Sequence, residues 1–497
     1  MSGVEIVAHY IQIDRQSSTP LFLQTKKGLE QAIIDGHFQI IKLPSTRHLS
    51  EQLNVSLNTV LMAYEELESQ GIIYSKSRSG RYVNPEIASQ QCLKKASSPI
   101  TTEQGWMHRA KKTSTPGNPV QLKRSTVDSE LPFPFITASV PEDSFPSAHW
   151  IKASREAFQA DSRKFSLYDN FGADDPVLID IILKDVLASR GINATAENII
   201  LTVGTQHALF LISELLIKKG TPVAVEEPGY PDARHAFLRA GAVISPVPLD
   251  ESGIILESIP DNTQIIYTTP SHQLPSNISM STPRKTGLLQ RAKQIDSCII
   301  EDDYDAEMRF IGRSSPPLAS NGLDNVIYIS GFSKHLGAVC RIAYIVAHKE
   351  IISSLQDIRR YQLRNLSGHE QRTLAHFIAN GAYDQQIRNL RKVAKKRWNL
   401  CQKLIKELLP DWTLTTSTGG LNLWVEVPKA INTTVLASHL RQQGIVIEPG
   451  PVFFSKHEKG NNFIKLGFIL LNEEKLREGL TRIAIFINSN ILTDIDT

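Results

Sequence analysis

A lysine and an arginine stand close together in the segment FSKHLGAVCR, residues 332–341. Lys334 is a primary amine that can form an imine with an aldehyde, and Arg341 offers a permanent, fork-shaped charge suited to a phosphate. Upstream, the segment IIEDDYDAEMRF places Asp302 at the end of an apolar run and Tyr304 two residues later. The chain therefore offers an amine, an anion-binding cation, a carboxylate and a phenol.

These four groups meet the chemical demands of one cofactor, pyridoxal phosphate. It needs a lysine for its aldehyde, a cation for its phosphate, a carboxylate beside its pyridine nitrogen and a donor to its phenolic oxygen. We predict these roles for Lys334, Arg341, Asp302 and Tyr304, in that order. Each residue alone has an ordinary interpretation, such as a snorkelling lysine or a solvated acidic loop. Their joint occurrence beside predicted strand ends favours the cofactor.

Other segments supply further contacts to the cofactor. LTVGTQHAL runs from a strand into a helix, so the amides of Gly204, Thr205 and Gln206 are expected to meet an anion at the positive helix end. Ring contacts are predicted from the segments EEPGYPDA, by stacking, and TPSHQLP, through polar groups. The residues expected around the ring are Tyr230, His272 and Gln273.

The segments that carry these residues follow an alternating pattern. Across residues 132–497, apolar runs such as NIILTV, PVAV, QIIYTT, CIIEDD, NVIYIS and IAYIVA alternate with longer helix-like segments. This alternation predicts an α/β domain with a mostly parallel central sheet covered by helices on both faces. Residues 85–131 are rich in Ser, Thr, Gln, Lys and Pro and poor in acids, which predicts a flexible basic linker.

Residues 1–84 are typical of a winged helix-turn-helix. A first helix is expected over about 21–35, Ser45 or Thr46 can cap a second, Ser56 can cap a third, and a two-stranded wing follows Gly71. Arg47 is then placed to reach a phosphate and the start of the third helix to face base edges. The predicted DNA contacts are Arg47, Ser56, Leu57, Asn58, Thr59, Lys76, Arg78 and Arg81. The alternative is a helical dimerisation module with solvated basic residues.

Composition limits the remaining classes of protein. The chain has 497 residues, 41% of them hydrophobic, and a net charge of +3, so two cores are expected and any DNA surface must be local. Its 4 cysteines show no C-x-x-C spacing, which argues against a disulfide framework and a zinc site. The amino terminus lacks a basic start followed by an apolar run. We expect a cytoplasmic protein with no metal and no membrane partner.

The stretch LPSTRHLSEQLNVSLNTVLMAYEELESQGIIYSKSRSGRYV resembles the amino-terminal domain of GntR-type regulators, through its L-P-S-x-R start, V-S-x-N-T-V turn, A-Y-x-x-L core and Ser-Gly wing tip. From Phe133 onward the chain resembles fold-type I aminotransferases. The combination resembles the MocR (GabR-like) family of bacterial regulators. This resemblance implies a homodimer and pyridoxal phosphate bound as an internal aldimine at Lys334. It also implies that cofactor or amine binding is reported through the linker to the DNA-binding domain.

Several residues depart from the family pattern. Leu57 stands where an arginine usually follows the serine, and Asn277 stands where glycine is favoured, although Asn tolerates a positive φ. Gly331 stands where a threonine usually precedes the lysine by three residues. Phosphate contacts are therefore expected to shift to Ser330 or Ser333, or to be fewer.

Lys465, in NNFIKLGF, stands where most relatives have an arginine that binds an α-carboxylate. Lysine cannot form the same bidentate pair, so Lys465 is expected to bind a ligand carboxylate less specifically or not at all. The alternative is that it is a surface charge on a strand edge. Either interpretation argues against robust transamination.

We therefore predict a transcriptional regulator that binds a double-stranded DNA operator and uses pyridoxal phosphate as ligand or co-effector, sensing a B6 vitamer, an amine or an amino acid. One alternative is a working aminotransferase that retains a DNA-binding domain. Another is a dimerisation body without cofactor, which Lys334, Arg341, Asp302 and Tyr304 together disfavour. The operator, the effector and the direction of regulation stay open.

Overall fold

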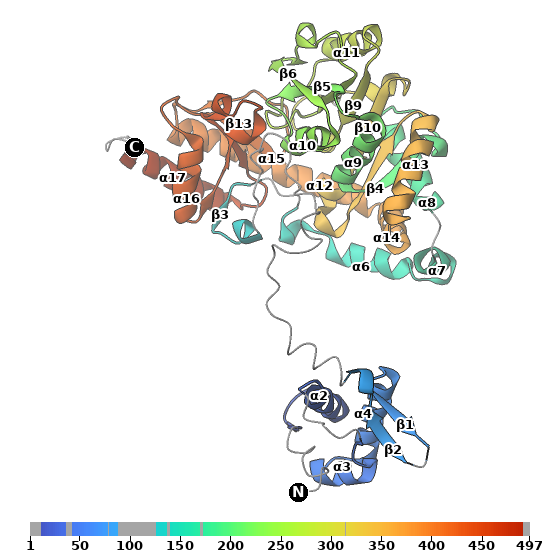
Figure 1. The fold of residues 1–497 in the computed structure, drawn as a ribbon. Coiled ribbons are helices and arrows are strands. Elements are labelled where there is room, and N and C mark those ends of the chain that lie inside the picture. The colour runs from blue at the N-terminus through green and yellow to red at the C-terminus, as the bar shows by residue number, and fades with distance from the viewer. Residues whose placement is uncertain are drawn as a thin grey trace. The chain divides into compact units, whose positions relative to one another are not determined.

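The chain divides into two compact units, residues 1–113 and 114–497 (Figure 1). The computed structural model describes residues 11–35, 42–77, 79–87, 126–136, 140–168, 172–313 and 315–490. Most of the predicted linker and the predicted DNA contact Arg78 lie outside the described residues. None of the helices in the described ranges combines the length and apolar character that a membrane crossing requires.

The smaller unit is a winged helix-turn-helix, as predicted. Ser45 caps the second helix by accepting from the amide of His48, and Ser56 caps the third by accepting from the amide of Thr59. The turn between these helices is closed by Asn54 in the left-handed conformation, with φ 50°. The elements are α2 (Leu21–Ile34), α3 (Thr46–Leu53), α4 (Leu57–Ser69) and a hairpin of β1 (Ile73–Lys76) and β2 (Gly80–Val83).

The apolar positions of these helices meet in one small core. Val60, Tyr64 and Leu67 recur along one face of α4 and are fully buried against Leu29 of α2 and Leu49 of α3. The phenol of the buried tyrosine donates a hydrogen bond to the carbonyl of Pro44, at 2.9 Å. The first residues of α4, Leu57 and Asn58, are exposed and are not part of this core.

The larger unit is built on an eight-stranded sheet of order β4-β11-β10-β9-β8-β5-β6-β7. The strands from β10 through β9, β8 and β5 to β6 pair in parallel, whereas β11 and β7 run antiparallel to their neighbours. The mostly parallel sheet was predicted, and the apolar runs quoted above form its strands. Their bounds are β4 (Ile199–Val203), β5 (Pro222–Glu227), β6 (Val243–Asp250), β7 (Gly253–Ile254), β8 (Ile265–Thr268), β9 (Cys298–Asp302), β10 (Val326–Gly331) and β11 (Ile342–Val346).

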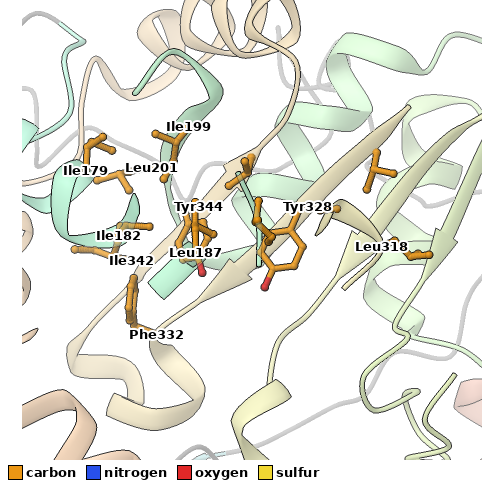
Figure 2. Close-up of a cluster of buried hydrophobic side chains, with 14 of the residues drawn as sticks. Ile179, Ile182, Leu187, Ile199, Leu201, Leu318, Tyr328, Phe332, Ile342 and Tyr344 are labelled. Atoms are coloured by element: carbon orange, nitrogen blue, oxygen red, sulfur yellow. The ribbon is translucent and has the colours of Figure 1, made fainter. Parts of the chain in front are cut away.

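Helices cover both faces of this sheet (Figure 1). Side chains of a strand alternate between faces, so Tyr328 and Ile329 of β10 enter different apolar clusters. Figure 2 shows the cluster of Tyr328, which also contains Tyr344 of β11 and Ile179 of α8. This face is covered by α8 (Pro176–Ile181), α11 (Thr282–Gln294) and α14 (Gly368–Ala379), and the other by α9 (Gly204–Leu216), α10 (Pro231–Ala240) and α13 (Lys349–Leu363).

A second, antiparallel sheet of order β12-β13-β16-β15 completes the larger unit. It packs in an apolar cluster with the long helix α15 and with α16 and α17. A short parallel pair joins β3 (Phe133–Pro134) to β14 (Ile445–Val446). The remaining bounds are β12 (Thr413–Leu414), β13 (Asn422–Glu426), β15 (Glu448–Pro449), β16 (Phe463–Gly467), α6 (Ser147–Glu156), α7 (Ala160–Leu167), α12 (Ser333–Leu336), α15 (Ala382–Leu408), α16 (Thr433–Gln442) and α17 (Glu473–Asn490).

Candidate functional site

A cavity of about 130 Å³ lies where the carboxyl ends of the parallel strands face the second sheet. The chain reaches it just after β4, β5, β8, β9 and β10, because parallel strands bring their carboxyl ends to one edge. Its lining contains six residues singled out in the sequence: Thr205, Tyr230, Asp302, Tyr304, Lys334 and Lys465. It also contains Asp232, Tyr267, Thr269, Leu274, Asp305, Leu421, Asn422 and Phe453.

Asp302 ends β9 and is buried with one carboxylate oxygen unused. Its Oδ2 accepts from the phenol of Tyr267 at 2.8 Å, whereas its buried Oδ1 has no hydrogen-bond partner among the described residues. The pKa of this carboxyl is raised to about 7, chiefly because the group is buried and also because Asp303 is close, while the hydrogen bond from Tyr267 and the charge of Lys334 oppose the rise. A cation placed at Oδ1 would satisfy this atom and favour the ionised carboxylate.

Lys334 lies on the short helix α12, beside Tyr304. Its Nζ is 5.8 Å from the centroid of the Tyr304 ring, and the phenol of Tyr304 donates to the carbonyl of His272 at 3.0 Å. The next residue, His335, is buried, with Nδ1 3.1 Å from the phenolic oxygen of Tyr383. This packing fixes the turn that carries the lysine.

The start of α9 lies next to Arg341, although neither Gly204 nor Arg341 lines the cavity. Gly204 begins the helix with φ +74°, and a Cβ added there would lie 3.6 Å from the guanidinium of Arg341. The guanidinium is therefore next to the helix end whose amides carry partial positive charge. Gln206 is turned to Tyr230 instead, because its Nε2 donates to the phenol of Tyr230 at 2.9 Å.

Two serines expected near the phosphate bind backbone atoms in the structure and do not line the cavity. The hydroxyl of Ser330 donates to the carbonyl of Asp303 at 2.9 Å, and that of Ser333 donates to the carbonyl of Cys340 at 2.8 Å. The absence of threonine at Gly331 has a steric reason, since a Cβ there would lie 2.8 Å from the side chain of the residue opposite on β11.

His272 and Gln273 also lie behind the cavity wall. Nδ1 of His272 is 2.9 Å from Oδ1 of Asp305, and Nε2 of Gln273 donates to the carbonyl of Pro228 at 2.7 Å. Both side chains thereby hold the loop whose carbonyl, at His272, accepts the hydrogen bond from Tyr304. In the same loop Asn277 has φ 58°, a positive φ of the kind that asparagine tolerates.

Lys465 is buried, so the interpretation as a surface charge is wrong. Its side chain is 2% exposed, and its Nζ is 3.1 Å from Oε2 of Glu448, whose side chain is 4% exposed. The two residues are direct cross-strand partners in the β15–β16 ladder. The Nζ also lies 5.5 Å from the ring centroid of Phe453. The cation expected to meet a ligand carboxylate is thus already paired with a carboxylate of this chain.

Several cavity residues were missed in the sequence. Tyr267 and Thr269 end the run QIIYTT, and the same strand-end rule that pointed to Asp302 could have found them. Asp232 stands two residues after Tyr230 and could have been considered with it. Asn422 and Glu448 come from the second sheet, and no local pattern places them near the cavity or its lysine.

The start of α4 presents a candidate surface for DNA. Leu57 is 54% exposed and Asn58 is also exposed, whereas the hydroxyl of Ser56 is committed to capping the helix. Arg47 is exposed on α3, with its Nε 3.3 Å from Glu51. Such weak surface pairing leaves the guanidinium able to meet a phosphate.

The predicted contacts of the wing lie differently. Lys76 is exposed, with its Nζ 5.0 Å from the ring centroid of Tyr82. Arg81 is half-buried against the helices, because its Nη1 donates to the hydroxyl of Thr46 at 3.1 Å and its guanidinium lies 5.0 Å from the ring centroid of Tyr64. Of these two cations, Lys76 has the more exposed side chain.

Known proteins match both units. Residues 22–83 match the model of the bacterial regulatory proteins, gntR family, and residues 139–483 match that of aminotransferase class I and II. The chain is 30% identical over 462 residues to the HTH-type transcriptional regulator TauR of Rhodobacter capsulatus, covering 92% of this chain and 95% of TauR. It is 29% identical over 484 residues to the probable rhizopine catabolism regulatory protein MocR of Rhizobium meliloti, covering 94% of each.

Among solved structures, a multiple substrate aminotransferase from Thermococcus profundus superposes with a TM-score of 0.67 at 25% identity, covering 72% of this chain and 92% of the aminotransferase. This likeness extends the aminotransferase match from sequence to fold.

Proposed function

Because the chain belongs to the MocR family, in which a GntR-type domain precedes an aminotransferase class I and II domain, we propose that it is a transcriptional regulator whose larger unit binds pyridoxal phosphate. In this proposal the winged helix-turn-helix binds a double-stranded operator. A small amine, amino acid or B6 vitamer binds in the cavity and changes DNA binding.

The unused Oδ1 of Asp302 is the observation that carries the cofactor proposal. A buried carboxylate oxygen without a partner is costly, and the pyridinium nitrogen of pyridoxal phosphate is a cation of the required kind. Bound there, the cofactor would supply an aldehyde that reacts with primary amines. Lys334 would provide the resident amine, Tyr230 a ring wall, and the start of α9 with Arg341 an anion site for the phosphate.

The pairing of Lys465 with Glu448 favours a regulatory function over aminotransferase activity. An aminotransferase that acts on α-amino acids needs a cation for their α-carboxylate, and here that cation is paired with the buried Glu448. A working aminotransferase remains the second function to test, and robust turnover of α-amino acids is not expected.

A homodimer is part of the proposal. Large apolar side chains are exposed on and beside α6 and α7, and patches of this kind mark protein interfaces. They are Ile151, Phe158, Leu167 and Tyr168, which are 50%, 51%, 58% and 69% exposed.

The experiment is borohydride reduction of protein saturated with pyridoxal phosphate, followed by peptide mass spectrometry. The expected adduct lies on Lys334 and disappears in Lys334→Ala, while the exposed Lys349→Ala, used as a matched control, keeps it. Lys334→Ala should still bind operator DNA but lose the response to ligand. An adduct absent from Lys334 in the saturated protein would overturn the cofactor proposal, and rapid keto-acid formation from amino acids would favour the aminotransferase.

A further inference from the structure

The pair of Lys465 and Glu448 decides which charge a ligand can bring to this side of the cavity. Both side chains are almost fully buried, and the two backbones pair directly in the β15–β16 ladder. If Lys465 turned to a ligand carboxylate, Glu448 would lose its 3.1 Å partner inside the protein. Removing one member of a buried ion pair leaves an uncompensated charge, which is strongly unfavourable. The pair therefore works against a ligand that carries a carboxylate.

Carboxylates of the protein make up much of the cavity's charge. Asp232, Asp302 and Asp305 line it together with Lys334 and Lys465. Under the proposed function, Asp302 faces the cationic ring nitrogen of the cofactor and Lys334 holds its aldehyde. Asp305 is hydrogen-bonded to His272 and Lys465 is paired with Glu448.

Asp232 is the acidic lining residue that this arrangement does not balance. It stands in the first turn of α10, and its Oδ2 accepts a hydrogen bond of 3.2 Å from the neutral phenol of Tyr230. Among the described residues it has no ion-pair partner. Its carboxylate is half-buried at the cavity wall, where a ligand cation would be partly shielded from water.

We propose that the ligand of this cavity is an amine with a second cationic group, such as an aliphatic diamine, and that Asp232 binds the second cation. This inference rests on the proposed function and specifies its ligand class. Such a site selects the opposite charge to an α-carboxylate site, because Glu448 is paired with Lys465 and Asp232 faces the ligand. Specificity then comes from repulsion of acidic ligands as well as attraction of cationic ones.

Asp232 also has a structural role to separate from this one. A carboxylate in the first turn of a helix stabilises the positive end of the helix dipole. Loss of that stabilisation would lower the melting temperature of the protein without changing which amines it prefers. The test therefore compares ligands of one chain length and does not depend on affinity for one ligand alone.

The experiment is isothermal titration calorimetry of the full-length protein loaded with pyridoxal phosphate, with putrescine, butylamine and γ-aminobutyrate as probes. The set with one more carbon, cadaverine, pentylamine and aminovalerate, is run in parallel. Putrescine or cadaverine should bind at least about tenfold more tightly than the matched monoamine, and the amino acid no more tightly than the monoamine. Asp232→Asn should remove the preference for the diamine over the matched monoamine, and Asp232→Glu should retain it.

Glu251→Gln, at an exposed carboxylate outside the cavity lining, is the matched control and should behave like the unaltered protein. Tighter binding of the amino acid than of the diamine, or a diamine preference that persists in Asp232→Asn, would refute the inference. The borohydride adduct on Lys334 is measured on the same protein preparations before any amine is added, because an added amine would take the place of Lys334 on the aldehyde. Its presence with the wrong ligand preference refutes the diamine inference alone, whereas its absence refutes the proposed function and this inference with it.

Discussion

The buried pair of Glu448 and Lys465 makes a strong prediction about stability. Glu448→Leu leaves the ammonium of a side chain that is 2% exposed without the carboxylate now 3.1 Å away. Lys465→Met leaves the carboxylate of Glu448, whose side chain is 4% exposed, without its ammonium partner. Breaking a buried pair from one side costs about 3–5 kcal/mol, whereas replacing both members with apolar residues of similar volume is often neutral or stabilising. Each single variant should lose about that much, and the double variant should lie within about 1 kcal/mol of the unaltered protein.

The assay is urea unfolding followed by tryptophan fluorescence. Trp424 is the cross-strand partner of Lys465 on β13 and stacks on Phe463 at a centroid distance of 5.3 Å, so its emission reports on this sheet. Thermal unfolding by calorimetry provides a second measure, in which the unfolding of the two units can be separated. Single variants that lose less than about 1 kcal/mol, or a double variant as unstable as the singles, would refute the argument that the two charges depend on each other.

Three further outcomes are expected. The pKa of Asp302 is raised to about 7, chiefly by burial, so between about pH 4 and 7 the cofactor-free folded protein binds more protons than the unfolded chain. The free energy of unfolding should therefore fall as pH rises from about 4 to 7. Asp302→Asn should flatten this part of the curve of unfolding free energy against pH. The exposed side chain of Leu57 is suited to the methyl group of thymine, so Leu57→Ala should relax the selected operator sequence at one position, as measured by selection from random DNA; an unchanged sequence preference would exclude that contact. Arg47→Ala should weaken binding to all DNA sequences and reduce the slope of log affinity against log salt by about one, in fluorescence anisotropy titrations; an unchanged slope would show that Arg47 meets no phosphate.

The parts of the site that follow strand ends could be predicted from the sequence. Asp302 ends an apolar run and Lys334 follows another, and parallel pairing of β9 with β10 brings such ends to one edge. The capping roles of Ser45 and Ser56 were predictable for a similar reason, because they depend on residues three positions away.

The direction of single side chains and the long-range pairs could not be predicted in this way. Ser330 lies on β10, where neighbouring side chains face opposite sides, and its hydroxyl is turned to a backbone carbonyl. The partner of Lys465 depends on the register between β15 and β16, and no local pattern sets that register. Arg81 points inward because Thr46 and the ring of Tyr64 offer it partners from distant helices.

The close approach of β10 and β11 at Gly331 restricts the routes by which this chain could acquire a threonine at this position. Threonine at Gly331 would meet the Cβ of Ala343 at 2.8 Å and the Cα behind it at 3.1 Å. Ala343→Gly would remove only the nearer of these obstacles, so the strands would still have to separate slightly. The two positions therefore form an epistatic pair with a preferred mutational order, in which the change on β11 precedes the change on β10.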